Sequence, residues 1–152
     1  MNPEERLKQL GIELPKPRSP VGSYVPSVRS GKLLFVSGLG PDPTDGKPWE
    51  GKVGADYTIE EGARAARAVG LAVLARVRNE IGSLDNVARL VKVLGFVSSA
   101  PGFGRQPAVM NGFSDLMVEV FGDAGRHARS AIGVNELPNN IPVEVETVFE
   151  LK

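Results

Sequence analysis

Residues 58–81 read TIEEGARAARAVGLAVLARVRNEI, the longest stretch of the sequence with one clear periodicity. Thr58 and Glu61 fit a capping box, in which the threonine caps the helix and the glutamate takes the third helical position. Apolar residues recur behind the cap at helical spacing, and most of the arginines fall off their stripe; the apolar positions are Ala63, Ala66, Val69, Val73, Leu74 and Val77. The pattern predicts a long amphipathic helix that is capped by Thr58 and ends near Ile81.

The segments on both sides of this helix predict strands and two further helices. Asn2 followed by Pro3 indicates a short helix to about Leu10, after which residues 12–23 carry three prolines and should be extended. The expected strands are Tyr24–Arg29, Leu33–Ser37, Val87–Ser98, Ser130–Asn135 and Pro142–Leu151. A further helix is expected over Ala108–Phe121, and loops over residues 41–48 and 100–107.

After the short N-terminal helix the order is strand, strand, helix, strand, helix, strand, strand. This order predicts an α+β fold, a mixed β-sheet with two helices packed on one face, in which the first and the last two strands form hairpins. We expect one domain over residues 1–152, with residues 1–22 as an N-terminal helix and extended arm. Two helices cover only one face of such a sheet, so the other face must be polar or meet another subunit.

The composition excludes several kinds of chemistry. The 152 residues include 18 Lys+Arg, 18 Asp+Glu, one His and no Cys, which leaves no disulfide, thiolate metal site, cysteine nucleophile or pair of histidine ligands. Zero net charge argues against a nucleic-acid partner. No apolar stretch is long enough for a signal peptide or a membrane span, so we expect a cytoplasmic protein without a membrane partner.

Two further features of the sequence bear on the chemistry. The glycine-rich stretch Gly102–Arg105 is interpreted as a loop, because it does not open onto a helix as a phosphate-binding loop does. His127 is either a base or a structural, solvent-facing side chain, and the sequence does not say whether it reaches a pocket.

The carboxylates of the last strand offer the most interesting candidates. If the final hairpin turns at Pro138 and Asn139, Arg129 lies opposite Val148 and shares a face with Glu144. Their backbones would then be roughly 13 Å apart, close enough for two long side chains to hold a small carboxylate ligand between them. The alternative is an arginine and a glutamate that balance charge on a solvated face.

Taken together, these segments resemble the reactive-intermediate deaminase family (RidA/YjgF, formerly the L-PSP endoribonucleases), in a longer bacterial subgroup. The strongest part is Arg129–Val134, followed by Leu137-Pro138 and Val143–Glu146. Supporting matches are Gly22–Tyr24, Phe35–Gly38 and Asn111. The resemblance implies a chorismate-mutase-like fold and a homotrimer with clefts at the subunit interfaces, which would cover the open face of the sheet.

The resemblance also implies an activity and a set of site residues. The family hydrolyses reactive 2-imino (enamine) acids to 2-oxo acids and ammonia without a cofactor or metal. Arg129 matches the arginine that binds the substrate carboxylate, and Glu144 matches the glutamate that positions the attacking water. Tyr24 matches a tyrosine from the neighbouring subunit. The other positions expected at the pocket are Ser37, Gly38, Asn111 and Ala131, where Ala131 stands in place of the family's usual cysteine.

The sequence leaves other functions open. The leading hypothesis is a 2-iminobutanoate/2-iminopropanoate deaminase that acts on C–N bonds in the control of metabolite damage. One alternative is a non-catalytic trimer that binds a small 2-oxo or amino acid, and another is a different small-molecule hydrolase on the same scaffold. An endoribonuclease comes last, because the chain has neither a basic surface nor an aromatic track for RNA. The physiological substrate is not specified by the sequence.

Overall fold

The computed structural model describes residues 1–152, and its helices and strands follow the expected order. They are α1 (Pro3–Gln9), β1 (Ser27–Ser30), β2 (Leu33–Leu39), α2 (Ile59–Ile81), β3 (Val87–Ser98), α3 (Gln106–Phe121), β4 (Ala128–Val134) and β5 (Val143–Leu151). Short 3₁₀ turns occur at Leu84–Asn86, Gly122–Gly125 and Pro138–Asn140. The α+β class is confirmed, with one mixed, five-stranded sheet.

The long helix α2 forms as its sequence predicts. The Thr58 hydroxyl accepts a hydrogen bond from the Glu61 backbone N–H at 3.1 Å, and the Glu61 carboxylate accepts one from the Thr58 N–H at 3.1 Å. The helix ends at Ile81 because Gly82 adopts a φ of 86°, a conformation that glycine takes without strain. Its apolar stripe lies in the core, so local signals were sufficient to define this element.

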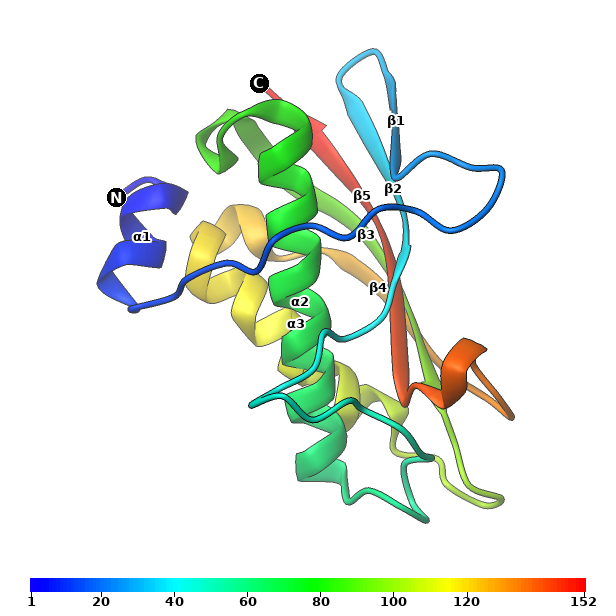
Figure 1. The fold of residues 1–152 in the computed structure, drawn as a ribbon. Helices are drawn as coiled ribbons and strands as arrows, with labels where there is room; N and C mark the ends of the chain where they lie inside the picture. The colour runs from blue at the N-terminus through cyan, green and yellow to red at the C-terminus, as the bar shows by residue number, and fades with distance from the viewer.

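Both large helices are crossovers between parallel strands, and this places them on one face. The sheet order is β1-β2-β5-β3-β4, and β5 runs antiparallel to both β2 and β3. Helix α2 therefore joins β2 to the parallel β3, and α3 joins β3 to the parallel β4. Both steps run in the same direction across the sheet, and crossovers of one hand then put both helices on the same side. Figure 1 shows α2 and α3 stacked on that side.

The predicted hairpin between the last two strands is wrong. Strand β4 pairs with β3 in parallel, and β3 separates it from β5. The physical reason is the crossover: α3 returns the chain to the end of the sheet where β3 began, so the next strand runs beside β3 in the same direction. Residues 135–142 then pass the end of β3 and reach β5, instead of forming a tight turn.

Several boundaries also differ from the prediction. Strand β1 begins at Ser27, because Pro26 has no N–H to contribute to the ladder. Helix α3 begins at Gln106, directly after the glycine-rich stretch, because the first turn of a helix accommodates Pro107. That stretch therefore does lead into a helix, contrary to expectation. Strand β4 begins at Ala128 and ends at Val134, and β5 begins at Val143.

The two faces of the sheet differ sharply. Toward the helices lies a core that includes Val93, Val145 and Phe149. The other face is open, and its apolar side chains are more exposed than is usual: Val28, Phe35 and Ile132 keep 55%, 45% and 44% of their surface accessible. Charged residues of β5 lie among them, including Glu146. The open face is thus a mixed surface that has no partner within the chain.

Candidate functional site

Glu144 lines a cavity of about 440 Å³ at the start of β5. Tyr24, Ser37 and Gly38 line the same cavity, so the fold brings four of the predicted site residues together. The pairing of β2 with β5 shifts register between Val36 and Leu39, and this irregularity opens the space in front of Glu144. The cavity is therefore built by a local departure from the regular sheet.

Gly38 and Ser37 shape this cavity in different ways. A Cβ on Gly38 would lie 2.9 Å from Oε2 of Glu144, so the carboxylate takes the space that only a glycine leaves free. The Ser37 hydroxyl donates to the carbonyl oxygen of Val25 at 2.8 Å and fastens the segment that carries Tyr24 to β2. The backbone N–H of Val21 donates to the Tyr24 hydroxyl at 3.4 Å. These contacts fix the rim of the cavity.

Glu144 is electrostatically suited to proton transfer. Its side chain is half-buried, and burial raises the pKa of the carboxyl above its ordinary value. The negative charge of Glu146 raises this pKa further. A carboxyl whose pKa is moved toward neutrality is a better proton acceptor and donor near neutral pH than an ordinary surface glutamate.

Arg129 lies elsewhere, between β4 and α3. Its Nη1 donates to Oδ1 of Asn111 and to Oγ of Ser114, each at 3.0 Å, and its Nη2 donates to the carbonyl oxygen of Pro107 at 3.4 Å. The three acceptors lie one helical turn apart along one side of α3. The contacts occupy both N–H groups of Nη1 and one of Nη2. Nε makes none of these contacts, and Nε–H together with Nη2 forms the edge of a guanidinium that binds a carboxylate in bidentate fashion.

His127 joins this cluster through Ser114. Its Nδ1 lies 2.7 Å from the Gly125 carbonyl oxygen, and its Nε2 lies 2.9 Å from the Ser114 hydroxyl. A carbonyl can only accept, so we assign the proton to Nδ1; Nε2 then accepts from Ser114, whose oxygen is free to accept from Arg129. Burial lowers the pKa of His127, the bond to Gly125 opposes this, and the charge of Arg129 lowers it further. The neutral imidazole is therefore the favoured form.

Sequence reasoning missed Ser114. Its only signal is its spacing from Asn111 on α3, which gains meaning once β4 is known to lie beside that helix. Ala131 follows Arg129 by two residues on the same face of β4 and packs against the edge of the core. Its side chain contributes no polar group to the Arg129 cluster.

Arg129 and Glu144 do not share a face, contrary to prediction. Arg129 pairs with Val93 and points toward α3, whereas Glu144 pairs with Phe96 on the open side of the sheet. Strand β3 also separates β4 from β5. The expectation of one face depended on the hairpin pairing that the structure replaces. A single chain thus holds two half-sites: the Glu144 cavity, with Tyr24, Ser37 and Gly38, and the Arg129 cluster, with Asn111, Ser114 and His127.

Two further features would bear on what the chain can bind: clusters of metal-ligating side chains and helices able to cross a membrane. No group of three or more His, Asp or Glu side chains is arranged to hold a metal ion. None of the helices has the length and apolar character that crossing a membrane requires.

Comparisons with known proteins place the chain among related sequences and structures. A family model described as "YjgF/chorismate mutase-like, putative endoribonuclease" matches residues 4–150. Protein TCP17 of Trypanosoma cruzi is 46% identical over 146 residues, which cover 95% of this chain and 91% of that protein. The crystal structure of Atu1372 from Agrobacterium tumefaciens, a protein of unknown function, is 41% identical, with a TM-score of 0.87 over 98% of this chain and 91% of that one. A structure described as a "putative endoribonuclease" from Shewanella oneidensis MR-1 is 34% identical, with a TM-score of 0.94 over 99% and 100% of the two chains.

Proposed function

The chain belongs to the RidA/YjgF family, and from this we propose that it is a hydrolase that deaminates reactive 2-imino acids to 2-oxo acids and ammonia. The proposal includes one domain over the whole chain, action in the cytoplasm and assembly as a homotrimer. The main support is the position of the Arg129 guanidinium. Asn111 and Ser114 hold this group through Nη1, and its Nε edge remains free to bind a carboxylate.

The substrate carboxylate would bind to that free edge. Two parallel N–H donors match the two oxygens of a carboxylate in geometry and charge. Because Nη1 is tied to two side chains of α3, the guanidinium loses little further freedom when the ligand binds. The C2 carbon of a 2-imino acid is bonded to its carboxylate carbon, so C2 would lie next to the guanidinium site. The attacking water must then lie beside C2.

Glu144 would position and activate that water. The water adds its oxygen to C2 while one of its protons passes to the Glu144 carboxylate, and the imine nitrogen takes up a proton from solvent to give a neutral carbinolamine. Glu144 then returns its proton to the amino group, and the C–N bond breaks with its electron pair on nitrogen, which leaves as ammonia. The hydroxyl at C2 gives its proton back to solvent and becomes the oxo group. The raised pKa of Glu144 supports both transfers, because the same group must accept and donate.

The two half-sites give a physical reason for the homotrimer. Arg129 lies at the β4 edge of the sheet, and the Glu144 cavity opens on the face that carries exposed Phe35 and Ile132. If the β4 edge of one subunit approached the open face of the next, the contact would cover these apolar groups and unite the half-sites. Such a contact is heterologous, and three of them close a ring.

Ammonia release from freshly generated 2-iminopropionate tests the activity. We expect turnover by the wild-type protein and a loss of about 100-fold or more in kcat/KM in Arg129→Ala, since the charge-assisted pair is lost. Arg126→Ala is the matched control: Arg126 is exposed and makes only a 3.6 Å ion pair with Asp123, so its activity should stay within about twofold.

The other outcomes identify the alternatives. Binding of 2-oxo acids that depends on Arg129, without ammonia release, would replace the enzyme with a binding protein. RNA cleavage that survives purification and is lost in Arg129→Ala would favour the endoribonuclease named in the family description. Ammonia release that persists in Arg129→Ala would refute the role given to this residue.

A further inference from the structure

A second cavity lies on the helix side of the molecule, between α2 and the segment 44–57. Its volume is about 420 Å³, within the range of sites for small molecules, and it shares no lining residue with the Glu144 cavity. The residues that matter here are Lys47, Trp49, Tyr57, Arg64, Arg67 and Leu71. None of the predicted site residues lines this cavity.

The aromatic wall of this cavity is held in position. Trp49 donates its indole N–H to the Thr44 hydroxyl at 3.0 Å, and the Tyr57 hydroxyl accepts from the backbone N–H of Glu50 at 3.0 Å. The two ring centroids are 5.5 Å apart, with the planes tilted by 56°. The polar atoms of both rings are thus already hydrogen-bonded, so the apolar part of the cavity wall consists of the two ring surfaces and the aliphatic side chain of Leu71.

The charges around this wall are all positive. Lys47, Arg64 and Arg67 line the cavity, and no Asp or Glu does, although the chain has equal numbers of acidic and basic residues. Arg67 is matched by Glu119 at 3.2 Å, but Lys47 and Arg64 take part in none of the ion pairs. The Glu61 carboxylate is hydrogen-bonded to Thr58 in the helix cap, and these hydrogen bonds lower the pKa of the Glu61 carboxyl more than the charge of Arg64 does. Lys47 and Arg64 therefore stand beside an apolar wall without an ion pair.

We infer that this cavity binds a small amphipathic carboxylate, with an aryl or short acyl body against Trp49, Tyr57 and Leu71 and its carboxylate between Arg64 and Lys47. An inorganic anion would leave the aromatic wall in water, and a neutral apolar molecule would leave both cations unmatched. A small carboxylate with an apolar body satisfies both parts of the cavity.

Trp49 supplies a direct test, because it is the only tryptophan of the chain. Its fluorescence reports on this cavity under excitation selective for tryptophan. We expect 3-phenylpropionate to change the emission saturably with a Kd below about 10 mM, and 3-phenylpropanamide, which has the same body without charge, to bind at least about fivefold more weakly. Higher salt should weaken the carboxylate only.

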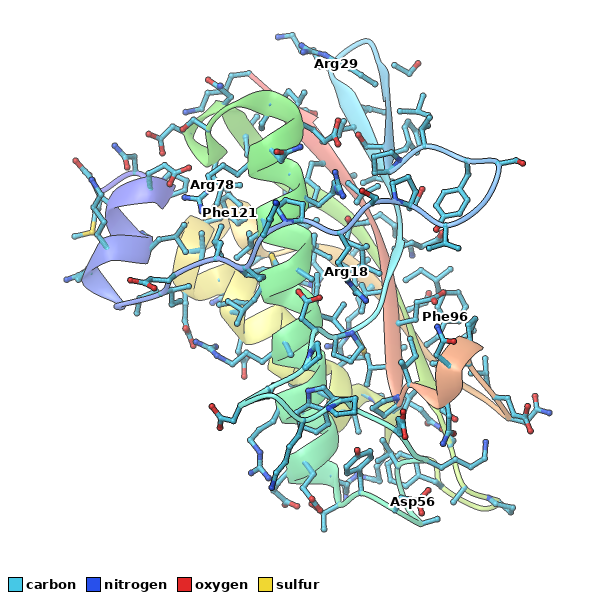
Figure 2. All side chains as sticks on the ribbon, viewed as in Figure 1. Arg18, Arg29, Asp56, Arg78, Phe96 and Phe121 are labelled. Atoms are coloured by element: carbon cyan, nitrogen blue, oxygen red, sulfur yellow. The ribbon has the colours of Figure 1, made fainter.

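Three variants show whether the fluorescence change arises in this cavity. Arg64 is exposed and unpaired on α2, so Arg64→Ala should fold normally and bind 3-phenylpropionate at least about fivefold more weakly. Arg29→Ala is the matched control; Figure 2 shows Arg29 at the opposite end of the molecule from Asp56, which belongs to the segment beside the cavity. Arg129→Ala should also retain the response, since the second half-site plays no part in it.

Three results would overturn the inference. The first is the absence of a saturable change up to about 10 mM 3-phenylpropionate. The second is equal binding of the amide, which would make the cavity a non-selective apolar groove. The third is equal weakening by Arg29→Ala and Arg64→Ala, which would reduce the effect to the overall charge of the protein.

Discussion

Gly112 of α3 lies directly against the backbone of α2, and Gly112→Ala should separate the two helices. A Cβ at this position would lie 2.0 Å from the carbonyl oxygen of Ala63, 2.7 Å from its carbon and 3.0 Å from its Cα. All three are backbone atoms of α2, so no side-chain rotation relieves the overlap. The helices must move apart by more than about 1 Å, in an interface that is packed as tightly as a crystal.

The expected cost follows from two opposing effects. Overpacking against a side chain costs about 1–3 kcal/mol, and against a fixed backbone we take the upper end, about 3 kcal/mol. Alanine is a better helix former than glycine by about 1 kcal/mol, which offsets part of the strain. The net loss in the free energy of unfolding should thus be at least about 2 kcal/mol.

Urea denaturation at one fixed protomer concentration measures this loss. Gly104→Ala is the control, because a Cβ there meets nothing within 4 Å and the residue is exposed; its midpoint should stay near that of the wild type. A Gly112→Ala protein as stable as the Gly104→Ala protein would refute the reasoning about the helix contact.

Three further predictions concern the half-sites. Gly38→Ala should shift the Glu144 carboxylate by a few tenths of an ångström, lowering kcat about tenfold with little loss of stability in urea, since only a flexible side chain must give way. His127→Phe keeps an aromatic ring but removes the acceptor for the Ser114 hydroxyl, so KM should rise about two- to tenfold in steady-state assays while kcat changes little. An unchanged KM would contradict the idea that His127 positions Arg129 through Ser114. Glu144→Gln should become more stable relative to the wild type as pH rises above 4.5, because the folded wild type binds the Glu144 proton more tightly than the unfolded chain does and loses stability until the raised pKa of this carboxyl is passed. Urea midpoints of both proteins across that pH range measure the difference in stability. A difference that does not change with pH would count against the raised pKa of Glu144.

Local signals in the sequence predicted the elements that depend on local interactions. The capping box at Thr58, the stripe behind it and the glycine at position 82 define α2 from end to end. Strand β3 was also predicted with both of its boundaries, because its β-branched and aliphatic run is bounded by turns.

The pairing of strands could not be obtained in the same way. Two strands that follow each other closely suggest a hairpin, but β4 also follows a strand and a helix, and that crossover determines its partner. The error moved Arg129 onto the wrong face and brought it near Glu144. The same missing contact between β4 and α3 hid Ser114 and left the role of His127 open.

The site residues came from the resemblance more than from periodicity. Arg129 and Glu144 stand in recognisable motifs, yet no spacing along the chain indicates that they lie on opposite sides of the sheet. The register shift that makes room beside Gly38 likewise has no local signal beyond the glycine itself. These are properties of how distant segments meet.

We propose that one active site takes Arg129 from one subunit and Glu144 from the next. The most direct measurement mixes Arg129→Ala and Glu144→Gln proteins in equal amounts, unfolds and refolds them together, and follows ammonia release from 2-iminopropionate. With random assembly, half of the subunits supply Arg129 and half of their neighbours supply Glu144, so about one quarter of the sites are intact and about one quarter of the activity of refolded wild type should return. A mixture as inactive as its two parents, beside an active refolded wild type, would contradict the shared site.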